Sequence, residues 1–144
     1  MNWIMTLLAV IAGISIGTQA GINGGFGKKI GVIEGAFVSF AIGTLILLVC
    51  TIFLGKGNLL NVFSVPKWQL TGGLLGAIYV LIMVLAVPKI GVATTIVSVI
   101  LGQVLISGVI DHFGLFGGKQ IPFDWQRGVA ALLLGISLFL MYKK

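Results

Sequence analysis

The sequence predicts an all-α integral membrane protein with five transmembrane helices and no soluble domain. Hydrophobic residues make up 58% of its 144 residues, charged residues 8%, and mean hydropathy is +1.20. A soluble domain of this length needs far more charge on its surface. A helix needs roughly 20 apolar residues to cross a hydrocarbon core about 30 Å thick. The runs that meet this requirement cover about residues 3–25, 32–54, 68–88, 91–110 and 125–142, and we expect them to form a single transmembrane domain.

The first span is expected to be retained as a membrane helix. It has no basic segment before it and is too long for the apolar part of a signal peptide. Its small residues Gly13, Gly17 and Gly21 recur every four positions, which is typical of a helix face that packs closely in lipid. The run Gly27-Lys28-Lys29 is predicted to form the turn that follows, since glycine commonly ends an element.

The second and third spans carry the same kind of spacing. Gly35, Ser39 and Gly43 recur every four residues in the second, and Gly72, Gly73 and Gly76 cluster in the third. The loop between the spans opens at Gly55-Lys56-Gly57-Asn58 and closes at Pro66-Lys67. These small-residue faces predict a compact bundle.

The fourth and fifth spans are each preceded by residues that favour a turn or a helix cap. Pro88-Lys89-Ile90-Gly91 predicts a tight turn before the fourth span. Asp124, just before Trp125, is predicted to cap the N-terminus of the fifth helix. All the loops are short, so they leave no room for an extramembrane catalytic domain.

Five spans put the two ends of the chain on opposite sides of the membrane. Trp3, Trp68 and Trp125 then fall on the N-terminal side, where the interface suits an indole ring. Four basic residues lie on that side (Lys56, Lys67, Lys119, Arg127) and five on the other (Lys28, Lys29, Lys89, Lys143, Lys144). A membrane protein is oriented by an excess of Lys and Arg on one side of the membrane. A split of four against five is almost even, so it specifies almost no orientation. We favour dual topology, in which copies insert both ways and pair antiparallel, over a single weakly specified orientation.

Polar residues form stripes within two of the apolar spans. Ser15, Gln19 and Asn23 recur every four residues in the first span, on the face opposite its glycines. Gln103, Ser107 and Asp111 do so in the fourth, with Ser98 earlier, and Tyr79 lies mid-span in the third. An amide in hydrocarbon needs a partner or water. The stripes are therefore interpreted either as interhelical hydrogen bonds or as the lining of a hydrated cavity at mid-membrane.

The charged residues near helix ends have two interpretations each. Glu34 lies near the start of the second span, where it suits the helix dipole or a lysine partner; alternatively it carries a coupling proton or cation. Asp111 and Arg127 end and begin neighbouring spans on the same side, and a structural ion pair is the favoured interpretation.

Several function classes find no support in the sequence. No GxxxxGK[ST] phosphate-binding motif is present. One His and one Cys (Cys50) give no metal cluster, no disulfide and no catalytic triad, so no cofactor, no metal and no enzyme activity are expected. The net charge of +6 comes from basic residues between apolar runs and at the C-terminus, which indicates lipid head groups rather than nucleic acid as partners.

Short motifs spread along nearly the whole chain resemble a known family. They are Gly17-Thr18-Gln19-Ala20-Gly21-Ile22-Asn23, Val38-Ser39-Phe40 with Gly43, Gly72-Gly73-Leu74-Leu75-Gly76, Pro88-Lys89-Ile90-Gly91, Gly102-Gln103, Asp111-His112-Phe113-Gly114, Arg127-Gly128 and Gly135. The order and spacing of these motifs resemble those of the YdcZ-like proteins of the drug/metabolite transporter superfamily. The resemblance implies a bacterial inner-membrane protein of about five helices, of a family found as single-domain copies, as pairs or as ten-helix fusions, and it implies an antiparallel dimer.

The leading functional hypothesis is a secondary transporter of a small polar or cationic solute, working by alternating access at the dimer interface. Its cavity is predicted to be lined by Gln19, Asn23 and Gln103, with Glu34 as the coupling acid. Ser15, Ser98 and Tyr79 are further candidates for the lining. The alternatives are a non-transporting membrane scaffold or subunit of a larger complex, and a passive channel.

Overall fold

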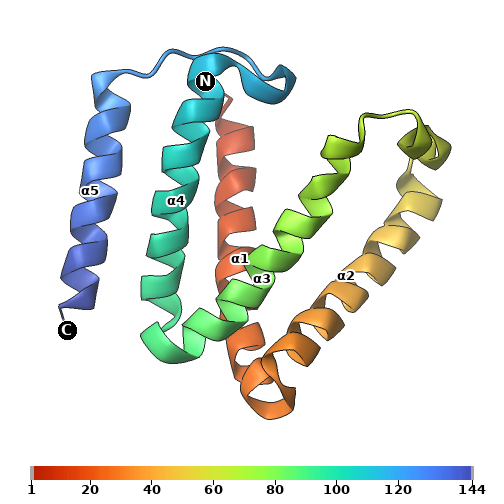
Figure 1. The fold of residues 1–144 in the computed structure, drawn as a ribbon, viewed down its shortest axis with the longest axis horizontal. Helices are drawn as coiled ribbons and strands as arrows, with labels where there is room; N and C mark the ends of the chain where they lie inside the picture. The colour runs from red at the N-terminus through yellow and green to blue at the C-terminus, as the bar shows by residue number, and fades with distance from the viewer. Residues whose placement is uncertain (1, 144) are drawn as a thin grey trace. The chain divides into compact units, whose positions relative to one another are not determined.

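The computed structural model describes residues 2–143 and is helical, with no strand in that range. Five long helices are present, as predicted, and all are long and apolar enough to cross a membrane (Figure 1). Their bounds are α1 (Trp3–Ile30), α2 (Val32–Leu54), α3 (Thr71–Ile90), α4 (Val92–Phe113) and α5 (Trp125–Tyr142). The chain divides into two compact units, the first ending at Lys89 and the second beginning at Ile90.

The first unit contains α1, α2 and α3, and α1 is longer than the sequence indicated. The run Gly27-Lys28-Lys29, predicted to be a turn, is part of the last turn of α1. Lysine is favourable there, because the C-terminal end of a helix dipole attracts cations. The helix ends at Ile30, and Gly31 follows it with a φ of +106°, a conformation that only glycine adopts readily.

Glycines near Gly31 bring the three helices of the first unit together. A Cβ on Gly24 would lie 2.5 Å from Val87 Cγ1, and one on Gly27 would overlap Val84 Cγ1. A Cβ on Gly35 of α2 would lie 3.2 Å from Gly27 Cα. Bare backbone at these positions lets the helices approach closely, which is how helices associate in lipid.

The small core of the first unit surrounds this crossing. Its buried apolar residues are Ala20, Ala36, Val80, Met83, Val84 and Val87, of which Val84 is fully buried. The predicted packing face at Gly13 and Gly17 is not used within the described residues, since a Cβ at either position would meet nothing within 4 Å. Close packing is confined to the Gly24–Gly35 end, and α1 and α2 diverge from there in Figure 1.

A longer connection joins α2 to α3 and contains two short 3-10 helices. These are η1 (Leu59–Phe63) and η2 (Lys67–Leu70). Trp68, predicted to begin the third span, lies in η2, and the α-helix starts at Thr71. Large apolar side chains of η1 are exposed, with Phe63 87% exposed, which suits a segment at a lipid interface.

One four-residue sequence occurs at two of the turns between helices, and in each turn a single residue lies outside the helices. Lys-Ile-Gly-Val occurs at residues 29–32 and again at 89–92. In each copy one glycine separates two helices, Gly31 with φ +106° and Gly91 with φ +82°. The second copy falls at the turn predicted for Pro88–Gly91, but Pro88, Lys89 and Ile90 belong to α3 and the turn is Gly91 alone. It lies close to the boundary between the two units along the chain.

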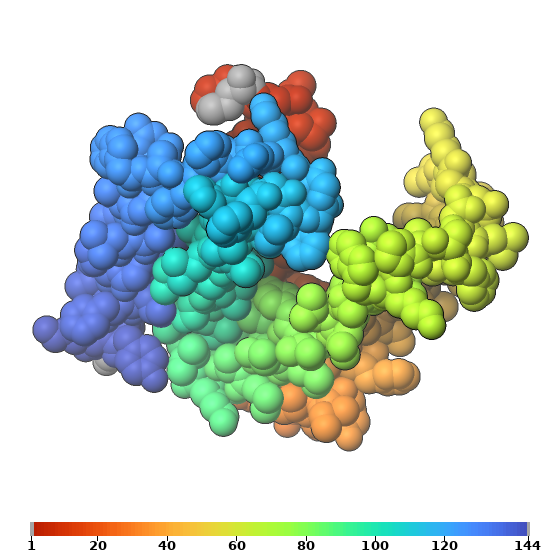
Figure 2. Space-filling view, turned by 45° about the horizontal axis from the view of Figure 1, so that its top comes forward, coloured from red at the N-terminus to blue at the C-terminus, as the bar shows by residue number. Residues whose placement is uncertain are grey.

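The second unit contains α4 and α5, which lie side by side in Figure 1. Gly114, in the left-handed conformation at φ +60°, ends α4. The following segment folds back, with Ile121 N donating to Asp111 O over 2.8 Å, and it covers the end of α4 in Figure 2 (light blue). Asp124 accepts a hydrogen bond from Arg127 N at 2.9 Å, which confirms it as the N-cap of α5.

Candidate functional site

Three of the predicted lining residues converge in the first unit. Gln19 and Asn23 from α1 and Tyr79 from α3 line one small void of about 10 Å³, together with Ile16, Ala20, Val80 and Met83. We call Gln19, Asn23 and Tyr79 the amide–phenol cluster. The four-residue spacing of Gln19 and Asn23 puts both amides on one face of α1, and α3 supplies the phenol opposite. The void is close to the volume of a single water-sized probe.

Tyr79 is the unusual member of the amide–phenol cluster. Its hydroxyl is buried and has no hydrogen-bond partner among the described residues. Leaving a buried hydroxyl unpaired costs about 1–3 kcal/mol. The site therefore contains a donor and acceptor that a bound molecule is able to satisfy.

Asn23 is the most buried polar member of the cluster, at 6% exposed. Its Nδ2 donates to Ser39 Oγ on α2 over 3.1 Å. Both side chains also line a larger hollow of about 340 Å³ between α1 and α2, with Ile22, Phe26, Val38 and Ile42. Ser39 was interpreted from the sequence only as a small packing residue, so its role as the partner of Asn23 was missed. A polar residue within a small-residue stripe was the available signal.

The remaining predicted lining residues are Ser15 in the first unit, which does not line the small void, and Ser98 and Gln103 in the second unit. Ser15 is exposed and donates to Ile11 O on its own helix at 3.0 Å. Ser98, half-buried on α4, donates to Thr94 O at 2.8 Å. Gln103 is exposed on α4. Ser98 and Gln103 belong to the second unit, so their place in a shared cavity stays a prediction.

Glu34 lies at the junction of α1 and α2. It is exposed in the first turn of α2, and its carboxylate occupies the space where a Cβ on Gly31 would lie. A carboxylate near a helix N-terminus is favoured by the helix dipole. This position also keeps the acid at the end of the span rather than at its centre.

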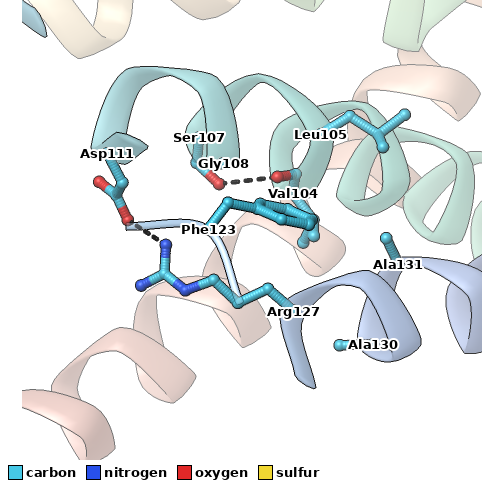
Figure 3. Close-up of a pocket in the computed structure, with 9 residues that line it drawn as sticks. All are labelled: Val104, Leu105, Ser107, Gly108, Asp111, Phe123, Arg127, Ala130 and Ala131. Carbon is cyan, nitrogen blue, oxygen red and sulfur yellow. Dashed lines mark hydrogen bonds and ion pairs between the residues drawn. The ribbon is translucent and has the colours of Figure 1, made fainter. Parts of the chain in front are cut away.

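The second unit holds the ion pair. Arg127 Nη1 lies 2.9 Å from Asp111 Oδ2, joining α5 to α4, as Figure 3 shows. The two side chains are 33% and 37% exposed. Around them lies a groove of about 230 Å³ that is lined mainly by apolar residues. Phe123, not singled out in the sequence, points its ring into this groove.

No group of three or more His, Cys, Asp or Glu side chains that suits a metal ion occurs within residues 2–143. The arrangement offers neutral amide, phenol and hydroxyl groups in one unit and an ion pair in the other. Such groups bind and orient polar molecules without supplying an activated nucleophile.

Comparison with known protein families identifies the family of the chain. A family model described as "Putative inner membrane exporter, YdcZ" matches residues 4–140. No curated protein and no solved structure matches the chain.

Proposed function

The chain belongs to the YdcZ family of the drug/metabolite transporter superfamily, and from this premise we propose that it exports a small polar or cationic solute as a secondary transporter. It is a multi-pass protein of the bacterial inner membrane, with five helices able to span the bilayer. In the proposed mechanism, two antiparallel copies expose one solute site to either side in turn. Transporters built with inverted symmetry bind near the bilayer midplane in this way.

The observation that carries the proposal is the unpaired Tyr79 hydroxyl beside Gln19 and Asn23. Polar groups inside a membrane span are costly and mark solute pathways. A purely structural cluster would pair all of its members, as Asn23 pairs with Ser39. A solute with one hydroxyl or ammonium group would complete the bonding that the chain leaves open.

The hollow between α1 and α2 supplies room for the rest of such a solute. At about 340 Å³ it lies at the lower end of small-molecule sites, and Asn23 and Ser39 are its polar lining. Asn23 lines both the hollow and the small void. It is thus suited to hold a solute group while Tyr79 binds another.

Two features support the antiparallel homodimer. The basic residues divide 4 to 5 between the sides, which leaves orientation almost unspecified. Gly13 and Gly17 form an open small-residue face, because a Cβ added at either position would meet no other described residue within 4 Å. Such a face allows a helix of a second copy to pack closely.

The experiment is solute-driven current from reconstituted liposomes on a solid-supported membrane. Concentration jumps of methylammonium, choline and putrescine should give saturable currents with the wild-type protein. Asn23→Ala should reduce the current at least tenfold, whereas Asn61→Ala, an exposed asparagine of η1, should leave it unchanged. Linear currents would indicate a channel. Full current in Asn23→Ala, or absence of both current and uptake of radiolabelled solute with every solute, would overturn the proposal.

The paired variants Gln19→Leu and Gln103→Leu test the extent of the site. Loss of current in both would place both stripes in the solute path. Loss in Gln19→Leu alone would restrict the site to the first unit.

A further inference from the structure

The second unit contains two neighbouring grooves, and the ring of Phe123 is part of the wall that they share. The first, of about 230 Å³, runs between α4 and α5 past Val104, Ala130 and Ala131. The second, of about 330 Å³, lies against Val109 and Phe113 of α4. Phe123 lines both.

Two glycines fix the ring of Phe123 in this position. A Cβ on Gly108 of α4 would lie 3.3 Å from Phe123 Cε2, and one on Gly128 of α5 would lie 3.6 Å from Phe123 Cε1. The backbone on either side is held as well, because Phe123 N donates to His112 Nδ1 at 3.1 Å and Asp124 caps α5. The ring therefore has a fixed place in the wall that the two grooves share.

Two oppositely charged side chains, Asp111 and Arg127, line one end of the first groove. Arg127 and Asp111 share one hydrogen bond, which leaves most guanidinium donors and Asp111 Oδ1 for other partners. Asp111 lies two residues before the end of α4, and Arg127 two residues after the start of α5. Trp125, exposed at that start, is the kind of residue that marks the lipid interface. The pair thus lies at head-group depth, with the apolar grooves running toward the hydrocarbon.

From this geometry we propose that the second unit binds one diacyl phospholipid whose head group carries a phosphate and a primary ammonium. The phosphate pairs with Arg127 and the ammonium with Asp111, while one acyl chain lies on each side of Phe123. Basic side chains between transmembrane helices are known to hold lipid head groups. A cavity of about 150 Å³ accommodates a benzene molecule, so each groove has room for a segment of acyl chain.

The charge of the site selects among lipids. Asp111 and Arg127 sum to zero, so the site matches a zwitterion, and Asp111 repels a purely anionic head group. Lipid that merely fills apolar grooves would show no such preference.

The test is native mass spectrometry of the purified protein with equal amounts of dioleoyl phosphatidylethanolamine and dioleoyl phosphatidylglycerol. We expect the ethanolamine lipid to be retained about tenfold more, the ratio given by one additional charge-assisted contact. Asp111→Asn should bring the ratio close to one, and Arg127→Gln should weaken retention of both lipids. Lys119→Gln removes an exposed basic residue from the segment between α4 and α5. It should change neither the ratio of the two lipids nor their retention.

A separate variant tests the grooves without touching the charges. Ala131→Leu fills the first groove and should reduce retention of both lipids while leaving their ratio unchanged. Equal retention of the two lipids by the wild type, or an unchanged ratio in Asp111→Asn, would overturn the proposal. A merely structural ion pair would alter melting temperature in these variants but not the lipid ratio.

Discussion

Asn23 of α1 and Ser39 of α2 are joined by a hydrogen bond of 3.1 Å from Nδ2 to Oγ, at a position where Asn23 is almost fully buried. The bond ties together two helices that are separated along the chain only by Gly31 and that diverge beyond it. It also fixes the amide between the small void and the larger hollow. The pair therefore combines a structural and a binding role, and the two can be separated by mutation.

The first prediction concerns this pair. Ser39→Ala and Asn23→Leu should each lower stability, and a double-mutant cycle should give a coupling energy of about 0.6 kcal/mol, as is usual for interhelical hydrogen bonds in membranes. Both quantities are measured by unfolding the variants in sodium dodecyl sulfate and monitoring the loss of helix by circular dichroism. A coupling energy of zero would show that the bond adds nothing to the stability of the folded protein.

Tyr79→Phe separates binding from stability. Removing a buried hydroxyl that lacks a partner relieves a cost of about 1–3 kcal/mol, so the variant should be as stable as the wild type or more stable. Solute-driven current should nevertheless fall, since the open bonding position is lost. Tyr142→Phe, at the exposed end of α5, is the matched control and should change neither quantity. A clear loss of stability in Tyr79→Phe would mean that the hydroxyl is satisfied.

Alanine at the glycines distinguishes the packing face from the open face. Gly24→Ala introduces a methyl group 2.5 Å from Val87 Cγ1 and should destabilise the protein by about 1–3 kcal/mol, the usual cost of overpacking. Gly13→Ala meets nothing within 4 Å in the described chain and should not destabilise an isolated copy. If Gly13→Ala instead weakens self-association, measured by crosslinking in liposomes, then the face belongs to the dimer interface.

Dual topology predicts that both ends of the chain are labelled from outside the cell. Single cysteines at Asn2 and at Lys143, in a Cys50→Ala background, should each react in part of the population with an impermeant maleimide. Gly57→Lys adds a positive charge in the α2–α3 connection and should shift the labelling toward one orientation. Labelling of one end alone would exclude the antiparallel homodimer.

Glu34→Gln tests coupling. If Glu34 carries the coupling proton, the variant should retain exchange of labelled for unlabelled solute but lose accumulation driven by a proton gradient. Flux assays with and without the gradient separate these activities. Full gradient-driven accumulation in the variant would assign Glu34 to the helix N-terminus alone, where its carboxylate lies over Gly31.

Hydropathy was sufficient to predict the number of helices, because a span of apolar residues has no alternative in lipid but to be helical. The ends of the helices were harder to place. Lys28 and Lys29 suit a turn as well as the last turn of a helix, and the close packing of Gly27 against Val84 is a contact that the sequence does not reveal.

The contacts between helices were the least predictable part. Several glycine stripes share the same spacing, and the sequence does not say which one meets another helix. Gly24 and Gly27, three residues apart, form the closest contacts, although the regular stripe at Gly13 and Gly17 was expected to do so. The convergence of Gln19 and Asn23 followed from helical periodicity, whereas Tyr79 joined them through the path of α3, which no local pattern encodes.

Gly91 has a mechanical consequence. It is the one residue between α3 and α4, so the covalent connection between the two units is a joint with two torsion angles and almost no length. A residue inserted beside Gly91 would therefore add length that the native connection between α3 and α4 lacks.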